Sequence, residues 1–222
     1  MNLILIGAQG SGKGTQAQRL VELHQLKACS SGDLLRKAIA QGTPIGKAAQ
    51  PYLERGDLVP DDLTIGLVLD CMDNRGEARG IILDGFPRNV AQARALDDRL
   101  AERRQQIDAA IYLEVPRDEL MRRLSGRYLC RAADHVWNIN SHPTRVPGIC
   151  DYDGSPLYQR GDDTAEKIAH RLDIFFSETI RLTDYYGPQG KLVRLDGGGP
   201  IDTVTRQIVG ALATRPVDRA VG

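Results

Sequence analysis

Residues 7–15, with the sequence GAQGSGKGT, constrain the fold more than any other part of this chain. They follow an apolar run at residues 3–6, which predicts a buried parallel strand, and they precede helical spacing over residues 13–23. A strand, a glycine-rich turn and a helix in this order direct backbone N–H groups and a helix N-terminus at one point, where they can hold a phosphate group. The chain is therefore expected to be an α/β protein that binds a nucleotide through its phosphates.

The loop itself indicates how the phosphates would be held. Its glycines allow the backbone to turn tightly, and Lys13 is long enough to reach the β- and γ-phosphates. The spacing from Gly7 to Lys13 fits the pattern G-x-x-x-x-G-K, but Gly14 stands where a serine or threonine usually follows. A direct hydroxyl ligand for Mg²⁺ at the usual position is thus missing. The residues expected at the phosphates are Gly10, Ser11, Gly12, Lys13, Gly14 and Thr15.

Strands and helices alternate along most of the chain. Short apolar runs at residues 27–30, 80–84, 108–116 and 191–197 predict strands, and amphipathic stretches between them predict helices. This alternation is typical of a parallel sheet flanked by helices, which together with the glycine-rich loop gives a P-loop NTPase-type fold. Residues 163–186 are expected to form one long helix, and residues 215–222 are expected to be frayed.

Two segments interrupt this alternation and divide the chain. Residues 30–59 are typical of short helices, whereas residues 126–163 are polar, rich in turn residues and interspersed with short β-like pieces. We expect a helical insertion over 30–59 and a small β-rich insertion over 126–163. Residues 1–29, 60–125 and 164–222 would then form the core.

Charge and cysteine content exclude several classes of protein. Acidic and basic residues balance to a formal net charge of zero, so a polyanion- or membrane-coating role is not expected. The N-terminal apolar run lacks a basic flank and is too short for a signal or membrane helix, so we expect a soluble, cytoplasmic protein. Four cysteines in 222 residues do not form a disulfide framework. Cys29 and Cys71, in apolar settings, are expected to be packed core thiols.

Several longer motifs occur in a fixed order along the chain. After the glycine-rich loop come SSGDLLRKAI, ERGDLVPDDLT, LDGFPRNVAQA, SGR and YQRGDD. With this set and order, the chain resembles the adenylate kinase family of nucleoside monophosphate kinases, in its long-lid form, over nearly its whole length. The most specific part of the resemblance is DGFPR after an apolar strand, combined with the phosphate loop.

The resemblance implies a reaction, its substrates and a role for each insertion. The reaction is the reversible transfer of a phosphoryl group from Mg·ATP to AMP, which gives two molecules of ADP and serves adenine-nucleotide homeostasis. The insertion at 30–59 would bind AMP, and the segment at 126–163 would form a lid over ATP. The protein would act as a monomer.

Phosphoryl transfer explains why arginines occupy the matching positions. The transition state is loose and its charge lies on the equatorial oxygens, so positioning and electrostatic stabilisation supply most of the catalysis. By the resemblance, Arg36, Arg88 and Arg171 hold the AMP phosphate, and Arg123 and Arg127 clamp the ATP phosphates. Arg160 would move in with the lid, and Asp84 would hold Mg²⁺ through water. The catalytic set implied in this way is Lys13, Arg88, Arg123, Arg160, Arg171 and Asp84.

The resemblance also assigns residues to the two adenine sites. An amide such as that of Gln92 can pair a donor and an acceptor with an adenine edge, which uracil and cytosine would not complement. The full AMP set is Ser31, Arg36, Asp57, Leu58, Val59, Gly85, Phe86, Pro87, Arg88, Gln92, Arg160 and Arg171. On the ATP side, Arg123, Arg127, Val136, Trp137 and Gly199 join the phosphate loop.

The lid segment carries a candidate metal site. Metal-bearing lids of the family use C-x-x-C followed by C-x-x-C or C-x-x-D. Here Cys130, Cys150 and Asp153 match the first, third and fourth ligands, but Ala133 stands at the second and cannot bind a metal. His135, two residues further on, would complete a tetrahedral set for a structural Zn²⁺ or similar transition metal.

Other arrangements of the lid stay open at this point. His142 is a more distant substitute for His135. The lid could instead be free of metal and held by hydrogen bonds. A disulfide between Cys130 and Cys150 is a further alternative, which a reducing cytosol disfavours.

Two other functions compete with the leading one. The first is a related kinase with another acceptor, such as UMP or CMP, or with GTP as donor; Gln92 and the long lid argue against pyrimidine acceptors. The second is a P-loop switch or metal-knuckle module that binds nucleic acid without turnover. The neutral net charge and the lack of a basic, aromatic stripe disfavour nucleic acid as a partner.

Overall fold

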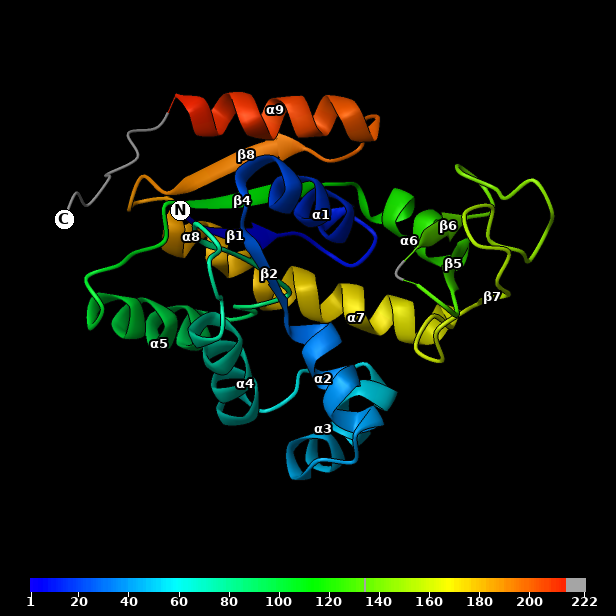
Figure 1. Ribbon diagram of the computed structural model, residues 1–222. Coiled ribbons are helices and arrows are strands. Elements are labelled where there is room, and N and C mark those ends of the chain that lie inside the picture. Colours follow the sequence, from blue (N-terminus) through cyan, green and yellow to red (C-terminus); the bar gives the residue numbers. More distant parts are fainter. Residues whose placement is uncertain (134, 215–222) are drawn as a thin grey trace.

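A five-stranded sheet forms the centre of the molecule (Figure 1). The computed structural model describes residues 1–133 and 135–214. The strands lie in the order β2-β3-β1-β4-β8, and every neighbouring pair is parallel. Their bounds are β1 Asn2–Ile6, β2 Lys27–Ser30, β3 Ile81–Asp84, β4 Ala109–Glu114 and β8 Leu192–Asp196. The predicted P-loop NTPase-type sheet is confirmed.

Side chains of the sheet alternate between two hydrophobic cores. In β1, Ile4 and Ile6 belong to a core with α4, α5, α6, α7 and α8, whereas Leu3 and Leu5 belong to a core with α1 and α9. Helices therefore cover both faces of the sheet (Figure 1). The bounds are α1 Lys13–His24, α4 Asp61–Asp73, α5 Val90–Ala101, α6 Arg117–Ser125, α7 Ala165–Ser177, α8 Leu182–Tyr186 and α9 Ile201–Ala213.

The first insertion is helical, as expected. It contains α2 Ser31–Ala40 and α3 Pro44–Arg55 and leads into α4. A Cβ on Gly46 would lie 2.2 Å from the carbonyl oxygen of Ala38, so a glycine at this position allows α2 and α3 to pack closely. Leu35, Ala49 and Val59 form a small core of their own.

The second insertion forms a three-stranded antiparallel sheet in the order β6-β5-β7. Its strands are β5 Arg127–Cys130, β6 Val136–Asn138 and β7 Leu157–Tyr158. Cys130, Trp137 and Cys150 form its core. The β-rich character predicted from the short β-like pieces is therefore confirmed.

The single helix predicted for residues 163–186 is wrong in its extent. The structure divides this stretch into α7, a 3₁₀ turn at Thr179–Arg181 and α8. Glu178, the C-cap of α7, has φ −112° and ψ −60°, and the Thr183 hydroxyl donates to the Ile180 carbonyl at 2.8 Å. Because the stretch contains neither glycine nor proline, its sequence does not signal this break.

The prediction that Cys29 and Cys71 are thiols is also wrong, because they form a disulfide bond. Both side chains belong to the same core, where β2 packs beside α4. Their Cα atoms lie 6.1 Å apart, within the span of disulfides. A sequence separation of 42 residues hides this proximity.

In the described part of the chain, none of the helices has the length and apolar character needed to cross a membrane. The frayed terminus predicted for residues 215–222 lies outside the described residues.

Candidate active site

The phosphate loop joins β1 to α1. Gly10 and Gly12 have φ values of 84° and 92°, in the left-handed region that favours glycine. A Cβ on Gly10 would also come within 3.0 Å of Leu124. Gly12 occupies the N-cap of α1, which has no side-chain cap within the described residues. The first N–H groups of α1 can therefore serve an anion together with the helix dipole.

Lys13 extends from the start of α1 back over this loop. Its Nζ donates to the carbonyl oxygens of Gly7 at 2.7 Å and Ala8 at 3.0 Å. Burial lowers the pKa of Lys13 to about 8, although Asp84 opposes this shift and Arg88 adds to it. A phosphate chain beside Lys13 would favour its charged form, so this side chain is suited to phosphate binding.

Asp84 ends β3 directly beside the loop. Parallel pairing puts Leu5 of β1 opposite Asp84, and the loop begins just after Leu5 and Ile6. A Cβ on Gly14 would lie 3.7 Å from Oδ2 of Asp84. A carboxylate therefore lies where loop-bound phosphates would bring Mg²⁺, an ion that prefers oxygen ligands.

The four arginines of the predicted AMP set, which are Arg36, Arg88, Arg160 and Arg171, come from four segments and influence one another. Burial lowers the pKa of Arg88 to about 10, and the charge of Arg171 adds to this shift. Burial also lowers the pKa of Arg160, with Arg36 as the next cause. Arg88 is oriented by a bond from Nε to the Gly85 carbonyl at 2.8 Å. The predicted residues thus converge, and their repulsion favours a bound anion.

Arg123 connects the phosphate loop to the loop that follows β8. Its Nη1 donates to the carbonyl oxygens of Gly10 at 3.4 Å and Gly197 at 3.1 Å, and its Nη2 donates to that of Gly198 at 3.0 Å. Its Nε donates to Glu119 at 2.7 Å. Arg123, which is predicted to clamp the ATP phosphates, is therefore fixed by bonds to the phosphate loop and to the loop after β8.

Asp163 joins two further predicted cations. It accepts a fork of bonds from Arg127 at 2.9 and 2.6 Å, and a third bond from Arg171 at 3.2 Å. Asp162 accepts from Arg171 at 2.9 Å. Because Thr164 caps α7, the two aspartates are not helix caps. They are instead partners of the arginines, at the point where the second insertion leads into α7.

Gln92 lies beneath the predicted AMP site with 1% exposure. Its Oε1 accepts from the backbone N–H of Arg88 at 2.7 Å, and its Nε2 donates to Asp61 at 2.7 Å. Asn89 also donates to Asp61 at 3.0 Å. Both ends of the Gln92 amide therefore already have a partner. A hydrogen bond from Gln92 to adenine would have to form beside these bonds or replace one of them. Sequence reasoning missed Asp61, since an aspartate at the start of a helix suggests only a cap.

A side chain of the first insertion binds the DGFPR turn, residues 84–88. Ser31 donates its hydroxyl to the Gly85 carbonyl at 2.6 Å. Gly85 has φ 73°, and a Cβ there would lie 3.0 Å from the Ser31 hydroxyl. Phe86 is fully buried and is followed by a cis bond to Pro87, which is also buried. Burial of Phe86 and the bond from Ser31 thus hold the turn in place, and Arg88 donates back to it.

The GDLV segment, residues 56–59, ends the first insertion and contacts α7. Asp57 accepts from Arg55 at 2.7 Å and lies 2.8 Å from Nε2 of His170, and hydrogen bonds to His170 and Arg55 lower its pKa. Val59 is buried and Leu58 is half-buried. The Asp57 side chain therefore contacts α7, whereas sequence reasoning assigned it to AMP.

The predicted ATP-adenine contacts differ in accessibility. Val136 is 53% exposed, whereas Trp137 is 4% exposed and stacks on His142, with ring centroids 4.8 Å apart. A Cβ on Gly199 would meet no described atom within 4 Å. Val136 and Gly199 are therefore accessible to a ligand, while Trp137 packs in the core of the second insertion.

The structure brings the four predicted metal ligands together. One ligand atom from each of Cys130, His135, Cys150 and Asp153 lies within 4.8 Å of the others. Nδ1 of His135 lies 3.3 Å from both Cys150 Sγ and Asp153 Oδ2, and Cys130 Sγ lies 3.1 Å from Asp153. Hydrogen bonds, above all from the Ser155 N–H, lower the pKa of Asp153 to about 2. Two sulfurs, an imidazole and a carboxylate fit Zn²⁺.

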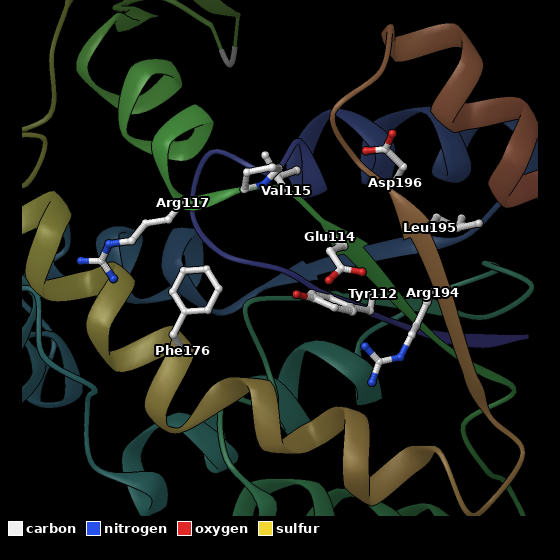
Figure 2. Close-up of a pocket in the computed structure, with 9 residues that line it drawn as sticks. Tyr112, Glu114, Val115, Arg117, Phe176, Arg194, Leu195 and Asp196 are labelled. Atoms are coloured by element: carbon white, nitrogen blue, oxygen red, sulfur yellow. The ribbon is translucent and has the colours of Figure 1, made fainter.

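A cavity of about 690 Å³ opens at the carboxyl ends of β4 and β8 (Figure 2). Tyr112, Arg194 and Phe176 line it, with the Arg194 guanidinium over the Tyr112 ring. Asp196, at its rim, accepts from the N–H of Gly198 at 2.7 Å. Its described lining includes none of the predicted nucleotide residues, so it borders the candidate site without being part of it.

Comparison with known proteins places this geometry in a family. A family model described as adenylate kinase matches residues 5–191. An adenylate kinase from Thermodesulfovibrio yellowstonii is 46% identical over 212 residues, which cover 96% of this chain and 99% of that protein. Proteins of the same name from Acidothermus cellulolyticus and Staphylococcus aureus are 44% and 42% identical, with 96% of this chain and 98% and 99% of their own lengths covered.

A phosphate loop, a carboxylate beside it and arginines from separated segments define a P-loop phosphotransferase. The family match over most of the chain makes this class specific: the chain belongs to the adenylate kinase family. It is therefore an ATP:AMP phosphotransferase whose substrates are ATP, AMP and ADP, with Mg²⁺ accompanying the nucleotide.

Proposed function

We propose that the predicted cations divide between the two substrates of this phosphotransfer. Lys13, Arg123 and Arg127 neutralise the ATP phosphates, and Arg88 and Arg171 hold the AMP phosphate. The observation that carries this proposal is geometric. Arg123 donates to Gly10 of the phosphate loop at 3.4 Å, whereas Arg88 donates to the carbonyl of Gly85, which also accepts from Ser31 of the first insertion.

The chemistry needs no nucleophilic side chain, because an oxygen of the AMP phosphate attacks the γ-phosphorus of ATP. The cations offset the negative charge that both phosphate chains bring together. Mg²⁺ would supply further charge neutralisation near Asp84. Arg160, which lies 3.8 Å from Asp33, adds positive charge from the lid.

A coupled assay tests the substrate assignment. AMP, GMP, UMP and CMP are offered as acceptors with ATP or GTP as donor, and AMP with ATP should give the highest kcat/KM. Arg88→Met should lower kcat/KM about 10²–10³-fold, the usual cost of losing one donor to a developing charge. Arg99→Met is the matched control, because Arg99 pairs with Glu102 on the exposed face of α5. Faster turnover of UMP than of AMP would contradict the proposal.

We further propose that residues 30–59 form the AMP-binding insertion, 126–163 the lid, and 1–29, 60–125 and 164–222 the core. Separate small hydrophobic cores in the two insertions support this division. Amide hydrogen exchange gives the test. AMP should protect residues 30–59, whereas a non-hydrolysable ATP analogue should protect residues 126–163. Protection by both ligands in one segment alone would refute the division.

The lid would bind a structural Zn²⁺ through Cys130, His135, Cys150 and Asp153. Ala133 leaves one position of the expected pattern without a donor, and His135 supplies an imidazole on the same side as the other three. Such a metal would hold the two hairpins of the lid together and leave the chemistry to the cationic site.

Metal analysis of the purified protein tests this site. The protein should carry one equivalent of metal and lose it on His135→Ala or Cys130→Ser. His142→Ala is the discriminating control, because His142 stacks on Trp137 and should leave the metal content unchanged. Chelator should lower the Tm of the wild type. Metal loss on His142→Ala with retention on His135→Ala would overturn the ligand set.

The family resemblance further supports a monomer acting in the cytoplasm. Light scattering should give a mass near the 24.4 kDa of one chain. Cell fractionation should recover the activity in the cytosolic fraction.

A further inference from the structure

The Cys29–Cys71 disulfide joins the two ends of the AMP-binding insertion. Cys29 lies in β2, one residue before the insertion begins, and Cys71 lies in α4, the helix that follows it. The bond therefore closes a loop that contains the whole insertion. Ser30, the next residue, caps α2, and Asp61 at the start of α4 accepts from Asn89.

The two sulfurs have unequal access to solvent. Cys29 is fully buried, whereas Cys71 retains 9% exposure. Val68 and Met72 lie in the same core, so the pair sits in an apolar site that large oxidants would not enter. A small oxidant would reach Cys71 first, and Cys29 is placed to react with it.

The two remaining cysteines are held differently. Cys130 and Cys150 lie among His135 and Asp153 in the lid, where a bound metal would occupy both sulfurs. Among the four cysteines, Cys29 and Cys71 are therefore the pair available for disulfide chemistry.

We propose that Cys29 and Cys71 are an oxidisable pair whose disulfide, formed by peroxide, fastens α4 to β2 and anchors the insertion. Hydrogen peroxide converts the Cys71 thiol to a sulfenic acid and releases water. The Cys29 thiol then attacks the Cys71 sulfur, forms the S–S bond and releases a second water, so two electrons pass to one peroxide. In a reducing cytosol the bond would form under oxidant, and small thiols would reverse it by attack on Cys71, the sulfur that keeps some exposure.

Peptide mapping tests the site directly, because trypsin places each cysteine in a different peptide. Cys29 falls in residues 28–36, Cys71 in 56–75, Cys130 in 128–131 and Cys150 in 146–160. The reduced protein is treated with hydrogen peroxide, remaining thiols are alkylated, and the digest is analysed without reductant. The expected product links 28–36 to 56–75, with a mass lower by two hydrogen atoms than the sum of the two peptides.

The map has outcomes that overturn the proposal. These are alkylation of both Cys29 and Cys71 after peroxide, oxidation of Cys71 to sulfinic acid without a link, or a link from 28–36 or 56–75 to a lid peptide. Dithiothreitol should abolish the expected product. Because the map uses the wild-type protein, it does not depend on any variant folding.

Melting temperature tests the anchoring role. The oxidised wild type should melt several degrees above the reduced form, and the difference should vanish in Cys71→Ala. KM for ATP and AMP should be the same in both forms, since neither sulfur lies among the predicted substrate residues. Equal Tm values for the oxidised and reduced wild type would show that the bond anchors nothing.

Discussion

Replacing Asp163 with alanine should destabilise the protein more than any change at a surface ion pair. The Asp163 side chain is 1% exposed and accepts three hydrogen bonds, two from Arg127 and one from Arg171. The Arg127 and Arg171 side chains are themselves only 16% and 8% exposed. Removing the carboxylate therefore leaves two poorly solvated guanidinium groups facing each other.

The size of the effect follows from this burial. Removing one partner of a buried, hydrogen-bonded charge pair costs about 3–5 kcal/mol, because the remaining charge is left uncompensated. For a chain of this length each kcal/mol lowers the Tm by about 2–4 °C, so Asp163→Ala should lower it by ~6–20 °C. Asp162 still accepts from Arg171, which moves the expected value toward the lower end.

Calorimetric unfolding near neutral pH, without nucleotide, measures this difference. The matched control is Glu102→Ala, which removes the partner of Arg99 at 2.7 Å where the two side chains are 61% and 44% exposed. Such an exposed pair contributes at most about 1 kcal/mol. If Asp163→Ala and Glu102→Ala melt within experimental error of each other, the buried pairing contributes nothing measurable and the reasoning is refuted.

Three further predictions concern the candidate site. Lys13→Met should lower kcat/KM by about 10²–10³-fold, whereas Lys47→Met on α3 should leave it unchanged in the same coupled assay. Gly85→Ala should raise KM for AMP but not for ATP, because a side chain at φ 73° adds about 1–3 kcal/mol of strain and its Cβ would press on the Ser31 hydroxyl at 3.0 Å. Burial lowers the pKa of Lys13 to about 8, so the free protein loses this charge as pH rises through that value. Calorimetric affinity for ATP should then fall between about pH 7 and pH 9, and Lys13→Arg, which stays charged, should abolish that fall.

The sheet and the phosphate loop could be predicted because their signals are local. A short apolar run followed by glycines specifies a buried strand and a tight turn, wherever the rest of the chain lies. The positions of Lys13 and Asp84 follow from these elements, since Lys13 begins the helix after the loop and Asp84 ends the strand paired with β1. The order of the motifs along the chain also predicted that the arginines converge. In the structure, Arg36, Arg88, Arg160 and Arg171 lie close enough together for their charges to interact.

The partners of the site residues could not be predicted, since they depend on contacts between distant segments. Asp61 pairs with Gln92 across 31 residues, and Arg127 pairs with Asp163 across 36. The Cys29–Cys71 bond is hidden for the same reason. Within a local segment, the break after α7 also escaped prediction, because neither glycine nor proline marks it and the bond from the Thr183 hydroxyl to the Ile180 carbonyl is seen only in the structure.

The pairing pattern explains how a chain with a formal net charge of zero can bind highly charged substrates. Arg127 and Arg171 share Asp163, and Arg36 and Arg160 share Asp33. These four guanidinium groups face three carboxylates, because Asp162 also accepts from Arg171, and the difference leaves a local excess of positive charge. Acidic residues elsewhere balance the total. Each shared carboxylate also fixes the direction of its two arginines, which lowers the cost of ordering them around a phosphate. A bound phosphate would compete with these carboxylates for the arginines, or share the arginines with them. Its affinity therefore depends on the local excess of positive charge and on the pre-organisation of the arginines. The net charge of the chain reveals neither property.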